Sequence, residues 1–96
     1  MAAYVIYQGE VTDPERYEEY KIKAAASIAA AGGRYLARGG DTECLEGDPP
    51  VGRTVVLEFP TVQAAVSWYR GEEYAAARRI REGAAKARMY LVAGVD

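Results

Sequence analysis

The chain has 96 residues, of which 50% are hydrophobic and 27% are charged, and its formal net charge is −2. This length and composition predict one small globular domain over residues 1–96. The slightly acidic balance argues against nucleic acid and against an anionic membrane surface as partners.

Three absences narrow the location and the chemistry further. No apolar run approaches the roughly 20 residues that a membrane helix needs, and no secretory hydrophobic region follows Met1. The lone Cys44 excludes an internal disulfide framework, so we expect the cytoplasm. The lack of histidine removes the usual general base, the partner of a nucleophilic Ser or Cys, and a proximal haem ligand. We therefore expect no metal and no cofactor, and any chemistry falls to Glu, Asp, Tyr, Arg or Lys.

The first strand and helix are clearly marked. Residues 3–11 begin with apolar side chains on both alternating faces, which predicts a strand. Residues 12–15 (T-D-P-E) predict a helix start, either with Asp13 as the cap and Pro at the first position or with a capping box closed by Glu15. One apolar stripe at spacings of three and four follows, formed by Tyr17, Tyr20, Ala24, Ile28 and Ala31. Gly32-Gly33 ends the helix.

The next stretch is shorter and rich in turn residues. Residues 34–38 predict a second strand, and Gly39-Gly40-Asp41 predicts a bend or a bulge. Residues 42–46 then either extend this strand or pair as an edge piece. The two prolines in residues 47–50 exclude regular pairing and predict a turn.

The most informative stretch is a strand followed directly by a helix. Residues 54–59 are β-branched, aliphatic or aromatic except for Glu58, which predicts a strand buried on both faces. Pro60 ends this strand because it has no N–H for a ladder, and Thr61 is the expected N-cap of a helix that reaches Trp68-Tyr69.

The rest of the chain repeats the helix-to-strand pattern. Gly71 predicts a break, Glu72 restarts the helix, and Gly83 ends it. One face of this helix is expected to carry Tyr74, Ala77, Arg78 and Arg81. Residues 88–95 predict the last strand.

The order β-α-β-β-α-β predicts an α+β, ferredoxin-like fold. Right-handed crossovers give a four-stranded antiparallel sheet with both helices on one face, the second helix being broken near Gly71. Val55, Leu57 and Phe59 can meet the helices, but Val56 then faces outward with apolar neighbours from the first and last strands. Such a face exceeds the roughly 300–600 Å² patch usual on a monomer, so we expect a homodimer through the open sheet face.

The sequence blocks resemble a known family. They are Y-V-I near the start, V-T-D-P-E-R-Y-E-E-Y, G-G-R-Y-L-A-R-G-G, V-V-L-E-F-P, S-W-Y followed by E-E-Y-A-A-A-R, and the closing Y-L-V-A-G-V. Together, over almost the whole chain, they resemble domain-of-unknown-function family 1330. Arg70-Gly71 departs from the serine-containing turn usual there, which concerns the helix break and not the fold.

This resemblance implies a subunit of the dimeric α/β-barrel superfamily. In that arrangement two ferredoxin-like sheets pack face to face. The family has no established activity, and relatives by fold include cofactor-free monooxygenases, lactone isomerases, haem enzymes and stress-response proteins. The fold therefore does not choose among these functions.

Glu58 is the first candidate site residue, because a carboxylate inside an apolar strand is costly unless it is paired. It is either a pocket acid or base, or one half of an ion pair with Arg38, Arg53 or an arginine of the last helix. In either case an arginine nitrogen should lie within ~3.2 Å of its carboxylate. Arg38, which precedes two glycines, either binds a carboxylate ligand or forms a salt bridge beside a bulge.

The second candidate group is aromatic. Tyr74 and Arg78 lie one turn apart, and Tyr20 and Trp68 are expected in the same layer, where the four would either line a small pocket or simply pack as core. The pocket interpretation expects Tyr74→Phe to leave thermal stability nearly unchanged. Cys44 has acidic neighbours and no histidine partner, so a structural role is expected.

Two functional hypotheses follow. In the first, a cofactor-independent enzyme or binder takes a small acidic or enolisable organic molecule. Arg38 or Arg78 would bind the anion, Glu58 would move a proton, and Tyr20 or Tyr74 would donate to an oxyanion. In the second, the protein is a non-catalytic structural or metabolite-binding dimer, and the same charged residues form structural ion pairs.

Overall fold

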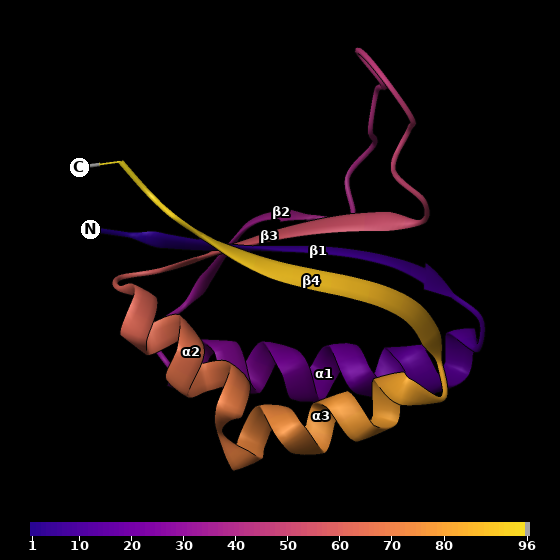
Figure 1. Ribbon diagram of the computed structural model, residues 1–96. Helices are drawn as coiled ribbons and strands as arrows, with labels where there is room; N and C mark the ends of the chain where they lie inside the picture. Colours follow the sequence, from indigo (N-terminus) through magenta and orange to yellow (C-terminus); the bar gives the residue numbers. More distant parts are fainter. Residues whose placement is uncertain (96) are drawn as a thin grey trace.

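The computed structural model describes residues 1–95 and contains a four-stranded sheet and three helices (Figure 1). In chain order the elements are β1 (Ala3–Val11), α1 (Pro14–Ala30), β2 (Arg34–Arg38), β3 (Arg53–Phe59), α2 (Val62–Arg70), α3 (Glu72–Glu82) and β4 (Ala85–Ala93). No helix in this part of the chain is both long enough and apolar enough to cross a bilayer.

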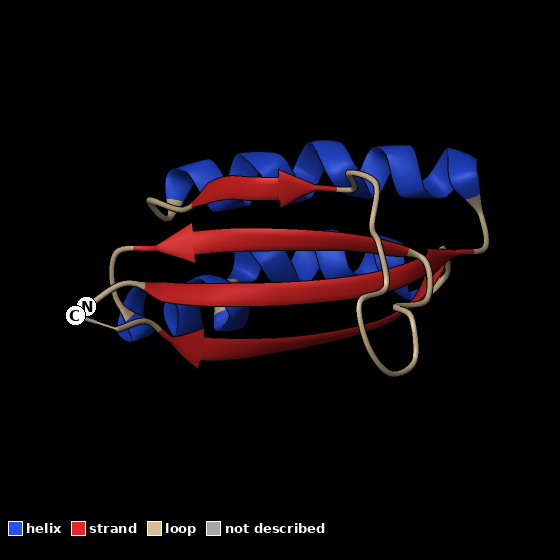
Figure 2. Cartoon of the chain, turned by 90° about the horizontal axis from the view of Figure 1, so that it is seen from above, coloured by secondary structure: helices blue, strands red, loops and turns tan. Residues whose placement is uncertain are grey.

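The sheet has the order β2-β3-β1-β4, and every neighbouring pair is antiparallel. All three helices lie on one face of it, as the edge-on and top views show (Figures 1 and 2). The ferredoxin-like α+β fold predicted from the sequence is confirmed, including the break of the second helix at Gly71.

Two strand predictions near the ends of the sheet are corrected. β4 begins at Ala85, three residues earlier than predicted, because it pairs along the whole of β1 up to Val11. Residues 42–46 form no strand. β3 is already paired with β2 on one side and with β1 on the other, so it has no free edge to which residues 42–46 could pair.

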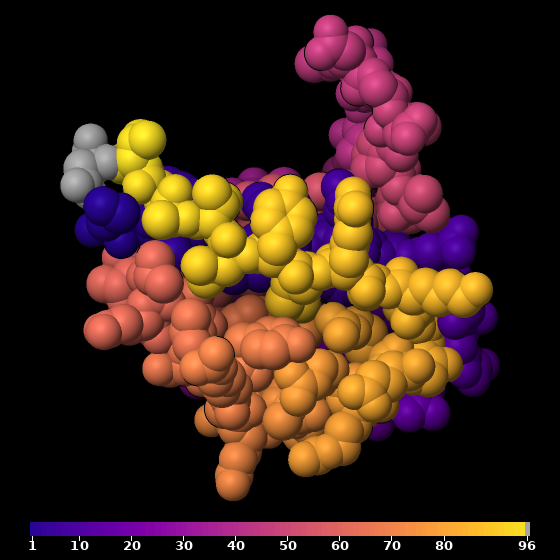
Figure 3. Space-filling model, in the orientation of Figure 1, coloured from indigo at the N-terminus to yellow at the C-terminus, as the bar shows by residue number. Residues whose placement is uncertain are grey.

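Residues 39–52, here called the arm, instead connect β2 to β3 as an irregular loop. The arm stands clear of the body on the side of the sheet opposite the helices (Figures 1 and 3). Of the bend or bulge predicted at Gly39-Gly40-Asp41, a bend forms at Gly39, whereas the bulge of β2 lies between Tyr35 and Ala37. Gly39 has a left-handed φ of +71° and donates its N–H to the Thr54 carbonyl, which turns the chain out of the sheet.

The alternation of side chains along the strands separates two faces. Val5 and Tyr7 of β1 and Leu57 and Phe59 of β3 point toward the helices and are almost fully buried. Trp68 of α2 completes this core, its ring centroid 5.2 Å from that of Phe59.

The opposite face, here called the open face, carries no helix. On this face Val56 of β3, Ile6 of β1 and Tyr90 of β4 lie next to one another in one row across three neighbouring strands. Tyr90 is 54% exposed and Val92 is 46% exposed, so large apolar side chains do face outward as predicted. A polar pair flanks this row: Arg88 of β4 donates two hydrogen bonds to the side chain of Gln8 on β1.

Both predicted helix caps are present. The Asp13 carboxylate accepts from the Arg16 N–H at 3.3 Å, and the Thr61 hydroxyl accepts from the Ala64 N–H at 3.0 Å. Each cap satisfies an amide that the first turn of its helix leaves free. Thr61 thereby fixes the direction in which the chain leaves β3 for α2.

Removing the Thr61 cap should destabilise the protein. We expect Thr61→Ala to cost about 1 kcal/mol of unfolding free energy, a fall of roughly 4–8 °C in Tm for a chain of this size. Thr61→Ser keeps the oxygen and is the matched control, with a Tm close to the parent. Differential scanning calorimetry measures both, and equal Tm values for the alanine and serine variants would contradict this role of the cap.

Candidate functional site

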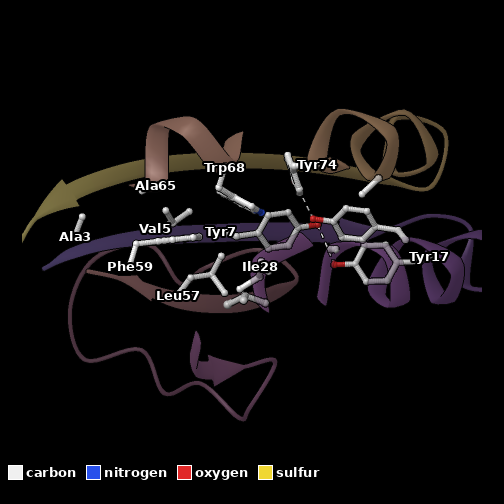
Figure 4. Packing of buried hydrophobic residues seen from close by; sticks show 14 of the residues in the cluster. Ala3, Val5, Tyr7, Tyr17, Ile28, Leu57, Phe59, Ala65, Trp68 and Tyr74 are labelled. Carbon is white, nitrogen blue, oxygen red and sulfur yellow. Dashed lines mark hydrogen bonds between the residues drawn. The ribbon is translucent and has the colours of Figure 1, made fainter. Parts of the chain in front are cut away.

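Four tyrosines meet between the sheet and the helices and form what is here called the phenol cluster: Tyr7, Tyr17, Tyr20 and Tyr74. All four are buried. Their hydroxyls are paired, Tyr17 donating to Tyr7 at 3.0 Å and Tyr20 lying 2.9 Å from Tyr74. Figure 4 shows the labelled Tyr7, Tyr17 and Tyr74 pointing toward one another from β1, α1 and α3.

Arg81 is the cation of this cluster. It lies two turns after Tyr74 on α3 and donates to the Tyr74 hydroxyl at 3.1 Å. Its guanidinium carbon also lies 5.7 Å and 5.9 Å from the ring centroids of Tyr7 and Tyr20. Within residues 1–95 Arg81 forms no salt bridge, so the phenols are its main partners.

Burial raises the pKa of all four phenols above the ordinary value, because a desolvated phenolate is disfavoured. Burial by itself lowers the pKa of Arg81, but the oxygens of Tyr74, Tyr20 and Tyr7 outweigh that effect and raise it. At neutral pH the cluster therefore holds protonated phenols and a charged guanidinium. It offers hydrogen-bond donors, not bases.

A narrow cavity of about 30 Å³, here called the inner cavity, opens beside three of these phenols. Tyr7, Tyr17 and Tyr20 line it, and Tyr74 and Arg81 stand behind Tyr20. Its charged lining residues are Lys21, Arg38 and Arg53, and no Asp or Glu of the described chain lines it. As it stands it has the volume of roughly one water molecule.

A second hollow of about 270 Å³, here called the outer hollow, lies between α2 and the exposed edge strand β4. Trp68 and Met89 line both hollows, so these two side chains form the wall between them. Trp68 is fixed by a hydrogen bond from its indole N–H to Ser27 at 3.0 Å, whereas Met89 is unbranched and adaptable.

Three of the six predicted site residues are brought together. Tyr20, Trp68 and Tyr74 do share one layer, the ring centroids of Trp68 and Tyr74 being 4.3 Å apart. Tyr74 is fully buried, lines neither hollow and bonds two partners, which favours the core interpretation of this residue over the pocket interpretation.

The two predicted arginines lie apart from that layer's centre. Arg78 stacks over Tyr69 with its guanidinium carbon 4.9 Å from the ring centroid, and it lines neither hollow. Arg38 is exposed, stacks over Tyr35 at 4.3 Å, and lines the inner cavity. Arg38 forms no salt bridge in residues 1–95, so the predicted ion pair beside a bulge is not formed.

Glu58 lies on the opposite side of the sheet from the phenol cluster. It pairs across the sheet with Tyr4 and Arg34 on the open face, since its neighbours Leu57 and Phe59 point inward. Its carboxylate accepts from Arg34 Nε at 2.6 Å, which confirms that an arginine is its partner. The three partners proposed from the sequence were wrong, because Arg38 and Arg53 project from the other face.

Sequence reasoning did not select Tyr7, Tyr17, Lys21 and Arg53 of the inner cavity, nor Arg81, the central cation. Tyr7 lies two residues after Val5, on the same face of β1, and Tyr17 lies three residues before Tyr20 on the apolar stripe of α1. The sequence pattern therefore indicated that both side chains face inward. Their pairing was not visible, because it joins β1 to α1. Arg81 was placed on the face of Tyr74, but spacing alone could not favour it over Arg78.

No metal centre is apparent in the part of the chain that the structure describes. Nowhere in it do three His, Cys, Asp or Glu side chains gather closely enough to hold an ion. Cys44 is exposed on the arm, where its thiol donates to the Gly47 carbonyl at 3.1 Å.

Comparison with known proteins gives a family and a fold. The model of a family described as a domain of unknown function (DUF1330) matches residues 2–95. No curated protein matches the chain.

Among solved structures, a protein of unknown function from Rhodopseudomonas palustris superposes with a TM-score of 0.79 at 18% identity, covering 99% of this chain and 83% of that one. SnoaB, a cofactor-independent oxygenase from Streptomyces nogalater, superposes with a TM-score of 0.64 at 11% identity, covering 99% and 94%. A dimeric ferredoxin-like protein of unknown function from Bacteroides fragilis gives 0.59 at 14% identity, covering 95% and 94%. These likenesses show the ferredoxin-like fold.

Removing the Tyr74 hydroxyl should destabilise the protein, because Tyr20 and Arg81 then lose a buried partner. We expect Tyr74→Phe to cost about 1–2 kcal/mol of unfolding free energy, and Tyr20→Phe a similar amount. The double variant should cost less than the two singles together, by about 1 kcal/mol, because their shared hydrogen bond is lost only once. Urea unfolding measures all three.

Tyr69→Phe is the matched control for this cycle. Tyr69 is 38% exposed, and its hydroxyl makes no hydrogen bond to the rest of residues 1–95, so its loss should change the unfolding free energy little. Additive costs for Tyr20→Phe and Tyr74→Phe would show that the two phenols are not coupled.

Proposed function

We propose that this chain, which belongs to the DUF1330 family, binds a small acidic or enolisable organic molecule between its sheet and its helices. The observation that carries this proposal is the lining of the inner cavity. Three buried phenols and three cationic side chains line it, with no carboxylate of the described chain among them. A ligand that is negatively charged, or becomes so, complements such a lining.

The chemistry of this lining favours an oxyanion. The protonated phenols of Tyr7 and Tyr20 donate hydrogen bonds to an enolate or phenolate oxygen, whereas Tyr17 already donates its proton to Tyr7. Tyr20 is itself backed by Tyr74 and Arg81. Donors fixed in a partly dry site stabilise such charge more than water does, because they need no reorganisation. The cofactor-independent oxygenase SnoaB shares the fold, and stabilisation of a substrate carbanion or enolate is the contribution that this donor set would make to chemistry of that kind.

The ligand requires more room than the inner cavity alone offers. The inner cavity and the outer hollow together reach the lower end of the range for small-ligand pockets, roughly 300 Å³. Because Trp68 and Met89 form the wall between them, a shift of the flexible Met89 side chain would join the two spaces. The ligand would then enter past β4 and reach the phenols.

We also propose that the protein is a homodimer through the open face. Apolar side chains cover this face around Val56 and Tyr90, and the neighbour from Bacteroides fragilis is dimeric with the same fold. The arm strengthens the proposal, because it projects on that side of the sheet and carries Leu45 at 90% exposure. In such a dimer the Arg34–Glu58 pair lies at the interface, so Glu58 has the structural role of the alternative hypothesis.

The ligand proposal is tested with acetylacetone, an enolisable diketone, and with its doubly C-methylated derivative, which cannot form that enol. We expect acetylacetone to bind at least tenfold more tightly, because only its enolate complements the phenols. The indole N–H signal of Trp68, the single tryptophan, reports binding in NMR titrations. Equal affinity for the two compounds, or no binding of either at millimolar concentration, would overturn the proposal.

A variant connects that binding to the phenol cluster. Tyr20→Phe should weaken acetylacetone binding about tenfold, the effect of one lost hydrogen bond of roughly 1.4 kcal/mol. Tyr4→Phe, on the open face and outside both the inner cavity and the outer hollow, is the control and should leave the affinity unchanged. Titrations are run well below the Tm of each variant, so that unfolded protein does not lower the apparent affinity.

The dimer proposal is tested by Val56→Asp. A charge at the centre of the open face should give monomer or aggregate, whereas the parent should scatter light as twice the chain mass at micromolar concentration. Gln63→Asp, on the exposed surface of α2, is the control and should remain dimeric. A stable monomer of the parent protein at that concentration would refute the dimer, as would a burial below ~1,200 Å² in a crystal.

A further inference from the structure

Arg53 at the start of β3 is the one charged residue of the inner cavity whose buried nitrogen has no partner. Its Nε–H is buried and donates a hydrogen bond to no atom of residues 1–95. The guanidinium carbon lies 5.7 Å from the ring centroid of Tyr17, whose hydroxyl is already engaged with Tyr7. A buried guanidinium N–H without an acceptor is costly, so its position calls for an acceptor that the described chain does not supply.

The arm holds Arg53 in this place through Gly39. A Cβ at position 39 would lie 2.8 Å from the guanidinium carbon of Arg53, so the backbone of Gly39 packs directly against the charged group. Gly39 also has a φ of +71°, which other residues adopt only with strain. The guanidinium is therefore confined between the arm and Tyr17, and cannot turn away to solvent without losing these contacts.

The surroundings of Arg53 are positively charged. Arg38 and Lys21 line the same cavity, from β2 and α1. Lys21 is paired with the exposed Glu18 at 2.8 Å, but neither Arg38 nor Arg53 forms a salt bridge within residues 1–95. The guanidinium carbon of Arg38 lies 4.3 Å from the ring centroid of Tyr35. Burial raises the pKa of Tyr35, and the charges of Arg38 and Arg53 oppose that rise.

We infer that Arg53, assisted by Arg38, binds a carboxylate group of the ligand at the arm side of the inner cavity. A guanidinium presents parallel N–H groups that match the two oxygens of a carboxylate. This inference rests on the proposed function and narrows its ligand class. The ligand carries a carboxylate at Arg53 and, farther inside, an enolisable carbonyl or phenol facing Tyr7, Tyr17 and Tyr20; a β-diketo acid has both groups.

The test compares acetopyruvate with its neutral methyl ester. Acetopyruvate is acetylacetone with one terminal methyl replaced by a carboxylate, so the two experiments share one scaffold. In the parent protein the acid should bind at least tenfold more tightly than the ester, by NMR titration of the Trp68 indole signal. Arg53→Met should abolish this preference while leaving the affinity for the ester within about twofold.

Two further variants test whether the preference for the acid depends on the charge and shape of the Arg53 guanidinium or on a nonspecific effect of removing an arginine. Arg53→Lys keeps the charge but loses the paired N–H groups, and should retain only part of the preference for the acid. Arg79→Met removes an exposed arginine of α3 that lies outside the inner cavity, and should leave the preference unchanged. The comparison of acid and ester in the parent protein needs no variant, so equal binding overturns the inference even if Arg53→Met fails to fold. In that case Arg53→Lys tests whether a measured preference depends on Arg53.

The possible outcomes distinguish this inference from the proposed function. Acid and ester binding equally well, or a preference that survives in Arg53→Met, would overturn the carboxylate site while the proposed function stands. Acetopyruvate binding in an Arg53-dependent way, with acetylacetone not bound at all, would support the carboxylate site and overturn the enol part of the proposed function. Failure of all these compounds to bind at millimolar concentration would overturn both.

Discussion

The strict alternation of side chains along β1 and β3 is the constraint on which the rest of this structure depends. Once Phe59 meets the helices, strand parity sends Leu57, Val55 and Arg53 inward and turns Glu58 and Val56 outward. The same rule places the phenol of Tyr7 under the helices. A single register decision therefore separates the residues of the candidate site from those of the open face.

Burial of tyrosines creates the second requirement, because each hydroxyl removed from water needs a partner. The four phenols meet it by pairing with one another and with Arg81, so the hydrogen bonds run between β1, α1 and α3 and tie the two layers together. The same groups are then both core and site. Their hydrogen bonds stabilise the fold, and their raised pKa keeps them as donors at neutral pH. The Nε of Arg53 has no such partner in residues 1–95, and we propose that a ligand supplies it.

The proposed ligand site and the proposed dimer interface lie on opposite faces of the sheet. The inner cavity and the outer hollow lie on the covered side, whereas the open face and the arm bear the exposed apolar side chains of the proposed dimer interface. The likeness to SnoaB and to proteins of unknown function concerns the fold, which many chemistries share. The proposed function therefore rests on the donors and cations that line the inner cavity.

The sequence by itself determined the order of the elements, the helix caps at Asp13 and Thr61, the break at Gly71, and the outward face of Val56. Each of these follows from local chemistry or from a period of two or 3.6 residues, which a single chain displays directly. It also indicated that Glu58 needs an arginine and that Tyr20, Trp68 and Tyr74 share a layer.

Only the tertiary structure decided which groups meet. Arg34 and not Arg38 faces Glu58, because the bulge after Tyr35 changes which side of β2 each arginine occupies. Arg81 and not Arg78 reaches Tyr74, and the arm brings Gly39 onto Arg53. These contacts depend on strand register and on how the elements pack, and no local sequence pattern predicts which particular side chains then meet.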